Sequence, residues 1–192
     1  MISNLLSKIA SHAGNDRLMR PSRGKLLGGL MVAMGVVATM GMVGLSHASQ
    51  DAQFPMPEGK TYIEECGGCH TAYAPGLLPA RSWIKLMSGL SRHFGDDASL
   101  EDKTRDKLTA DLVALAADSR AANALMQRIN AAIPASATPE RISKTGFFNF
   151  MHDEVSGSIW RRPRIGTPSN CMACHTKTEA GRYHEREVHI PK

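Results

Sequence analysis

The sequence contains one five-residue pattern twice, as Cys-Gly-Gly-Cys-His at residues 66–70 and as Cys-Met-Ala-Cys-His at residues 171–175. The two copies use all four cysteines of the 192-residue chain. Cys-x-x-Cys-His is the pattern of c-type haem attachment, in which both thiols bond to the haem vinyl groups. The histidine that follows ligates the iron from one face. The two copies therefore predict two haem c groups, attached by Cys66, Cys69, Cys171 and Cys174 and ligated by His70 and His175.

Other uses of paired cysteines are weaker interpretations. Four thiolates can hold zinc, but the two pairs lie far apart in the chain, and a zinc site does not require a histidine after each pair. A disulfide within each pair would close a short, strained loop. A thioredoxin-like redox motif needs a βαβ context, which the sequence does not indicate. Haem attachment remains the favoured interpretation.

The N-terminal segment has the pattern of an export signal. Residues 26–45 are apolar and uncharged, and five basic residues precede or open this run. The run ends at Ser-His-Ala, residues 46–48, which resembles a small-x-small cleavage site. Its length is also about that of a membrane span. We therefore expect residues 1–48 to be a signal peptide cleaved after Ala48, or alternatively an uncleaved anchor, with the rest of the chain exported.

The charge of the chain does not point to nucleic acid. The formal net charge is +5, but residues 1–48 hold five of the 23 basic residues and one of the 18 acidic ones, so the exported part is close to neutral. Its one dense basic stretch is Arg-Arg-Pro-Arg at residues 161–164. Those side chains could bind a partner, but pairing with haem propionates is at least as good an interpretation.

The exported part shows helical periodicity and no sustained strand alternation. We expect a helix to carry or enter the first haem pattern, and each pattern to place its two cysteines and its histidine on one helical turn. From residue 80 to residue 94 apolar side chains recur at helical spacing, with His93 on the same stripe and Gly95 as a suitable end.

Three further helices are expected. Ser99 and Asp102 resemble a capping box in front of a helix that carries three leucines on one face. Another helix is predicted over residues 122–129, capped near Ser119, and a third runs from Thr138-Pro139 to His152. The fold class is therefore all-α, with long irregular connections. The Pro- and Ala-rich residues 134–139 suggest two small haem lobes, residues 49–135 and residues 136–192.

Each iron also needs a sixth ligand or an open position. His93 and His152 are the main candidates, because each lies on a predicted helix and 23 residues from the histidine of the nearer haem pattern. A histidine on a core-facing stripe can also be a simple packed residue, and Met151 is a rival to His152. The tail histidines, His184 and His189, are more simply interpreted as surface residues.

These residues resemble the bacterial dihaem cytochrome c family known as DHC. The resemblance covers most of residues 55–192 and is carried by the stretches at 65–70, 81–83 (Arg-Ser-Trp), 93–100 (His-Phe-Gly-Asp-Asp-Ala-Ser-Leu), 168–175, 181–183 and 190–191. It implies a periplasmic electron carrier with two bis-histidine, low-potential haems, in which His93 and His152 are the distal ligands. It also implies redox partners, either a small oxygen-binding monohaem cytochrome or a membrane b-type cytochrome.

Electron transfer without substrate turnover is the expected function. If both irons are six-coordinate, no coordination position is left for a substrate. The alternative is a peroxidase-like dihaem enzyme with one open iron, although a chain this short leaves few residues to build a substrate pocket. A haem-based sensor is a third possibility, but the sequence contains nothing that resembles a signalling domain.

Overall fold

The computed structural model describes residues 53–192. The predicted signal peptide, residues 1–48, lies outside these residues. Within the described part, no helix has both the length and the apolar character needed to cross a membrane.

Helices joined by long connections make up the described chain. The α-helices are α1 (Thr61–Cys66), α2 (Ala80–Ser88), α3 (Asp102–Ala114), α4 (Ala124–Ala131), α5 (Gly146–Met151) and α6 (Gly157–Trp160). Single 3-10 turns lie at Pro75–Leu77, Leu90–Arg92, Ile142–Lys144, Cys171–Ala173, Thr178–Ala180 and Glu185–Glu187. Residues 53–192 contain isolated β-bridges but no strand. The predicted all-α fold class is therefore confirmed.

The helix predicted over residues 80–94 ends earlier than expected. α2 stops at Ser88, and the Gly89 N–H closes its last turn on the Leu86 carbonyl. Glycine is a poor helix residue but a good helix terminator. The chain then forms the 3-10 turn Leu90–Arg92, so His93 does not continue a helical stripe. The core-facing stripe itself is confirmed as far as Met87, which is buried like Trp83.

The helix starts were predicted less well than the buried faces. Ser99 does not cap α3; its own N–H bonds to the Asp97 carboxylate at 2.9 Å, and the helix starts only at Asp102. α4 is capped by Asn123 in place of Ser119, because the Asn123 side chain accepts the Met126 N–H at 3.0 Å.

The helix predicted from Thr138 is also shorter. The Arg81 Nε donates to the Ala137 carbonyl at 2.7 Å, so this stretch runs over α2 as an irregular segment. The helix α5 starts only at Gly146, where the Thr145 hydroxyl accepts the Phe148 N–H at 3.2 Å. The one-turn helix α6 lies in a stretch for which the sequence predicted no helix.

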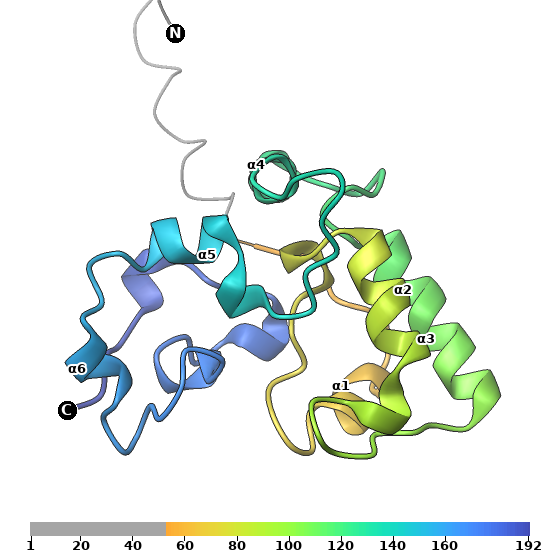
Figure 1. The fold of residues 1–192 in the computed structure, drawn as a ribbon, viewed down its shortest axis with the longest axis horizontal. Coiled ribbons are helices and arrows are strands. Elements are labelled where there is room, and N and C mark those ends of the chain that lie inside the picture. Colours follow the sequence, from red (N-terminus) through yellow and green to blue (C-terminus); the bar gives the residue numbers. More distant parts are fainter. Residues whose placement is uncertain (1–52) are drawn as a thin grey trace, which may run out of the picture. The chain divides into compact units, whose positions relative to one another are not determined.

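The apolar core lies mainly in the first half of the described chain. α2 and α3 lie side by side and bury Trp83, Met87, Leu108 and Leu112 between them and the first connections (Figure 1). A second cluster joins α4 to the start of the described chain, and its buried members are Phe54, Ala74, Ala117, Met126, Ile129 and Ile133. Beyond residue 133, Ile165 is the only fully buried apolar side chain in the described residues.

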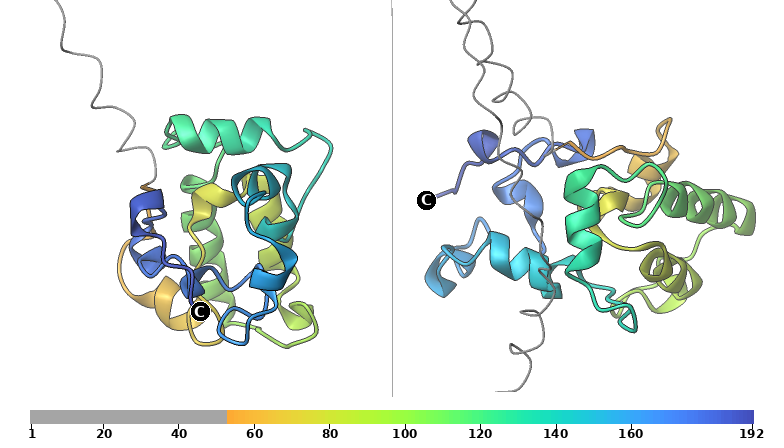
Figure 2. Two further views of the ribbon diagram at one scale, coloured as in Figure 1. Left: turned by 90° about the vertical axis from the view of Figure 1, so that its left-hand side faces the viewer. Right: turned by 90° about the horizontal axis from the view of Figure 1, so that it is seen from above.

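The C-terminal tail is tied to the first described residues. The Phe54 N–H donates to the Gly181 carbonyl at 2.8 Å, and the Phe54 ring packs edge-on against Tyr183. A buried hydrogen bond of 2.8 Å joins the hydroxyls of Thr71 and Thr178. Figure 2 shows the tail, in dark blue, running beside the first described residues, in orange. The division into lobes at residues 135 and 136 stays a prediction.

Candidate haem sites

The first Cys-x-x-Cys-His pattern starts where a helix ends. α1 stops at Cys66, and the rest of the pattern continues in turns through Gly67 and Gly68. The prediction of one shared helical turn is therefore wrong here, because two successive glycines do not sustain a helix. The prediction that a helix enters the pattern is confirmed. His70 is exposed, and its Nδ1 lies 2.8 Å from the Thr71 carbonyl oxygen.

The second pattern does form a single turn. The 3-10 turn Cys171–Ala173 continues until the His175 N–H donates to the Cys171 carbonyl at 2.8 Å. The tail fixes this turn from outside, because the His189 N–H donates to the Cys174 carbonyl at 3.0 Å. The shared turn that the sequence predicts is confirmed for this pattern.

His93 is held in a tight turn that faces the first pattern. Its N–H donates to the Asp96 carbonyl at 2.8 Å, and the Asp96 N–H donates back at 3.1 Å. Phe94, inside the turn, has a φ of +57°, which is unusual for a bulky side chain. Strained backbone of this kind is common where a structure must position a functional group. The His93 ring centroid lies 6.0 Å from that of His70.

His152 is the residue that ends α5, and it faces the second pattern. Its Nδ1 lies 2.9 Å from the Phe148 carbonyl oxygen, one helical turn back, and its ring stacks on the Phe148 ring at 4.1 Å. The His152 and His175 ring centroids are 6.1 Å apart. Met151, the rival candidate, is 55% exposed.

The distances within both histidine pairs fit an intervening metal ion. Two imidazoles on opposite sides of one metal, each with a metal–nitrogen bond of about 2.0–2.1 Å, have ring centroids roughly 6 Å apart. A carbonyl oxygen can only accept, so the Nδ1 atoms of His70 and His152 are the protonated ones. Their Nε2 lone pairs are then available for an iron. Histidines that ligate a metal usually donate their other ring N–H to a carbonyl or carboxylate, which fixes the orientation of the ring.

The electrostatics at two of the four histidines also favour neutral ligands. Burial lowers the pKa of His93, and the facing His70 lowers it further. Burial likewise lowers the pKa of His175, with a further contribution from the facing His152. Only the neutral imidazole has a lone pair to give to a metal.

Burial keeps three of the four cysteine thiols protonated. Burial raises the pKa of Cys66 and that of Cys171 to about 11, and it raises the pKa of Cys174 as well. Across residues 53–192 no three His, Cys, Asp or Glu side chains converge on one position. The four-thiolate zinc site is therefore not formed.

Tyr73 connects the two haem patterns and was not singled out from the sequence. Its ring stacks on His70, with centroids 5.0 Å apart and planes 26° apart. Its hydroxyl donates to the Ser169 carbonyl at 2.7 Å, two residues before Cys171. Burial raises the pKa of Tyr73 to about 12, so the phenol stays neutral. The only signal for it in the sequence was its position three residues after His70.

Two other aromatic side chains contact the histidines. The Tyr183 ring centroid lies 5.4 Å from that of His175, and burial raises the Tyr183 pKa. Phe148 stacks on His152, and its position four residues earlier in the chain would have indicated this contact, because i and i+4 side chains meet on a helix. Tyr183 is in the tail, where the sequence gives no comparable spacing.

The tail histidines have other roles in the structure. The His184 Nδ1 accepts the Arg186 N–H at 3.3 Å and caps the turn Glu185–Glu187. Its Nε2 is buried and has no hydrogen-bond partner among the described residues, so His184 is not the simple surface residue that the sequence suggested. His189 has an exposed side chain, and its contact with the second pattern is through the backbone.

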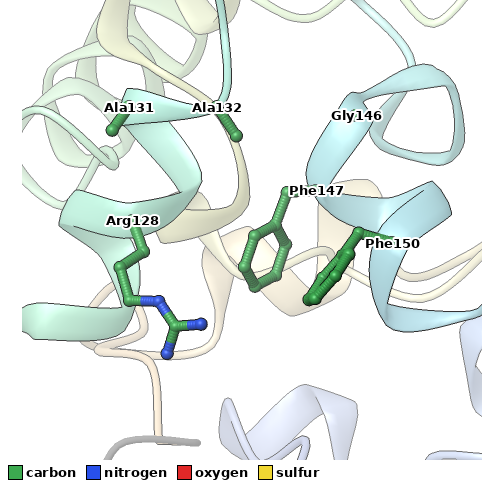
Figure 3. Close-up of a pocket in the computed structure, with 6 residues that line it drawn as sticks. All are labelled: Arg128, Ala131, Ala132, Gly146, Phe147 and Phe150. Carbon is green, nitrogen blue, oxygen red and sulfur yellow. The ribbon is translucent and has the colours of Figure 1, made fainter.

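One surface pocket of the described residues includes none of the four facing histidines in its lining. It has a volume of about 390 Å³ and lies between α4 and α5, with Arg128 on one side and Phe147 and Phe150 on the other (Figure 3). None of the predicted haem ligands lines it.

Comparison with known proteins places these sites in context. Residues 62–183 match the family described as "Dihaem cytochrome c". The chain is similar to the diheme cytochrome c from Rhodobacter sphaeroides, with 42% identity and a TM-score of 0.58 over 66% of this chain and 97% of that one. It is also similar to the diheme cytochrome c from Shewanella baltica, with 33% identity and a TM-score of 0.57 over 71% and 95% of the two chains. A search of curated proteins gives no significant match.

Proposed function

The chain belongs to the dihaem cytochrome c family and carries two haem c groups, and from this premise we propose that it is an exported electron carrier with two bis-histidine irons. In this proposal His70 and His93 ligate the first iron, and His175 and His152 ligate the second. Cys66 and Cys69 attach the first haem, and Cys171 and Cys174 attach the second.

One observation carries the proposal. Each Cys-x-x-Cys-His histidine faces a second histidine at a ring-centroid distance of 6.0 or 6.1 Å. A bound haem iron supplies one-electron chemistry, and the four side chains determine what else the iron can do. With two imidazoles on each iron, the protein leaves no coordination position for a substrate. Two imidazoles also give a lower reduction potential than a histidine–methionine pair.

Removal of each distal histidine tests the assignment. His93→Ala should convert the first iron, and His152→Ala the second, from low-spin to high-spin, and each altered iron should then bind carbon monoxide. Absorption spectra of the oxidised, reduced and carbon monoxide-treated proteins measure this. His189→Ala is the matched control and should leave both spectra unchanged, since its side chain is exposed.

The enzyme alternative makes the opposite prediction. A peroxidase-like protein would keep one iron open, so the unmodified protein would already contain a high-spin iron and would consume hydrogen peroxide rapidly. Either finding in the unmodified protein would replace the electron-carrier proposal with the enzyme one. Covalent attachment is checked separately, because intact mass should exceed the polypeptide mass by two haems.

Location and partners complete the proposal. We expect residues 1–48 to direct export to the periplasm, so the N-terminal sequence of the mature protein should begin near Ser49. Recovery of the whole chain in a membrane fraction would favour the anchor. The proposed partners are a small monohaem cytochrome or a membrane b-type cytochrome. Stopped-flow mixing of the reduced protein with each oxidised partner tests which of them accepts its electrons.

A further inference from the structure

We infer that the two irons hold their axial imidazoles in different relative orientations, nearer to parallel at the first site and nearer to perpendicular at the second, and that Phe148 sets the orientation at the second. The inference rests on the bis-histidine ligation proposed above. It goes beyond that proposal, because ligation alone does not determine how the two ring planes are turned relative to one another.

The angles between the facing rings differ strongly. At the first site the His70 and His93 planes are 32° apart. At the second site the His152 and His175 planes are 76° apart. The centroid distances are nearly equal at the two sites, so the difference lies in rotation of the rings and not in their separation.

The second site fixes its distal ring on three sides. The His152 Nδ1–H bonds to the Phe148 carbonyl at 2.9 Å. The Phe148 ring lies flat against the imidazole, with centroids 4.1 Å apart and planes 20° apart. Trp160 adds a tilted contact at 5.9 Å. The terminal torsion of a histidine is broad in energy, so contacts of this kind decide the plane of the ring. His152 therefore takes the plane of Phe148, which is turned away from that of His175.

The first site fixes its proximal ring in a comparable way. The His70 Nδ1–H bonds to the Thr71 carbonyl, and Tyr73 stacks on the ring with planes 26° apart. Phe94 meets His93 edge-on and is itself covered by the Arg141 guanidinium at 4.0 Å. The stacked aromatic thus holds the proximal ring at the first site and the distal ring at the second.

The orientation of the rings has a spectroscopic consequence. Each imidazole donates π density from the orbital perpendicular to its plane. When the rings are parallel, both act on the same one of two iron d orbitals, and the energies of these two orbitals are split. When the rings are perpendicular, each ring acts on a different one of the two orbitals, and their energies stay close. A low-spin ferric ion then gives a rhombic electron paramagnetic resonance (EPR) signal in the first case and a highly anisotropic signal in the second. Ring orientation is thus one of the ways in which axial ligands tune a haem.

EPR spectroscopy of the fully oxidised protein tests the inference directly. We expect two low-spin signals of equal integrated intensity, one rhombic and one highly anisotropic. Two rhombic signals, or two highly anisotropic ones, would overturn the inference and leave bis-histidine ligation intact. A high-spin signal in the unmodified protein would instead contradict the proposed function, so the two failures are distinguishable.

Substitution at Phe148 tests the cause. Phe148→Leu removes the flat surface but keeps the backbone carbonyl that orients Nδ1, so the highly anisotropic signal should shift or broaden while the rhombic one is unchanged. Phe148→Tyr keeps the stacked ring and should restore the original signal. Phe150→Leu is the matched control on the same helix, since Phe150 is 68% exposed and contacts none of the four histidines. An unchanged anisotropic signal in Phe148→Leu would contradict the role of Phe148.

A reciprocal substitution at the first site completes the test. Tyr73→Leu removes the ring that stacks on His70, so the rhombic signal should change, whereas Tyr73→Phe keeps the ring, loses only the hydrogen bond to the Ser169 carbonyl, and should retain the rhombic signal. Intact mass confirms that each variant carries both haems. If a variant fails to load haem, the spectrum of the unmodified protein still decides whether the two sites differ.

Discussion

Gly181 lies where the tail crosses the first described residues, and its backbone accepts the Phe54 N–H. Its φ is +70°, and a Cβ added there would lie 2.1 Å from the Phe54 carbonyl oxygen. Gly181→Ala should therefore destabilise the protein both through the left-handed conformation, which costs about 1–2 kcal/mol for an L-residue, and through a clash with backbone. Forced repacking costs roughly 1–3 kcal/mol more. Denaturant unfolding of the haem-loaded protein measures the sum.

Gly166 provides the matched control for this substitution. It has nearly the same φ, +73°, but a Cβ there would meet nothing within 4 Å. Gly166→Ala should lose only the conformational contribution. Equal losses of stability in the two variants would mean that the Phe54–Gly181 contact is not tight.

At the scale of single residues, the sequence predicted chemistry better than geometry. The two Cys-x-x-Cys-His patterns identify six side chains at once, because the cysteines that attach a haem and the histidine that ligates its iron lie within five consecutive residues. His93 and His152 were predicted as ligands from their spacing to the two patterns and from the resemblance to the dihaem cytochrome c family. The orientation of the histidine rings depends on Tyr73 at His70, on Phe148 at His152 and on the strained turn at Phe94 beside His93. No local sequence pattern specifies those contacts.

At the scale of elements, α5 is the helix that positions the second distal ligand. It is only six residues long, so its own hydrogen bonds contribute little stability. Thr145 caps it through the Phe148 N–H and is itself buried. Thr145→Ala should cost about 1 kcal/mol through loss of the cap, while Thr145→Ser should cost less because it keeps the hydroxyl. Unfolding in denaturant, monitored by the haem absorbance, gives both values.

The helix boundaries show what element prediction lacked. The buried stripes of α2, α3 and α4 follow from helical spacing, because apolar side chains must face a common core. The ends of the helices depend on which of several nearby side chains or backbone groups takes each free N–H or carbonyl. Asp97 takes the Ser99 N–H, Asn123 outcompetes Ser119 for the α4 cap, and Gly89 ends α2 before His93. Single-residue preferences do not show which of several adjacent caps the tertiary structure will use.

At the scale of the whole molecule, the described chain divides its apolar burial unevenly. The clusters around α2, α3 and α4 hold nearly all of the buried apolar side chains, whereas Ile165 stands alone beyond residue 133. Four large apolar side chains of the C-terminal part are at least 40% exposed, and they are Phe150, Met151, Met172 and Ile190. A segment that buries so little apolar surface does not offset its loss of conformational entropy. We therefore expect the second haem to supply the core of this part.

The two haems should consequently differ in how far the fold depends on them. In a Cys171→Ser/Cys174→Ser variant that has lost its second haem, residues 148–176 should exchange their amide hydrogens almost as fast as an unfolded chain, because little buried surface remains to protect them. Helices α2 and α3 should stay protected in that variant. They should also stay protected in the matched Cys66→Ser/Cys69→Ser variant, because Leu108 and Leu112 remain packed against Trp83 and Met87. Hydrogen exchange followed by mass spectrometry resolves the two regions, with haem content verified by absorbance. Strong protection of residues 148–176 in the protein without its second haem would show that these residues stay folded through their own hydrogen bonds and contacts, without the haem as a core.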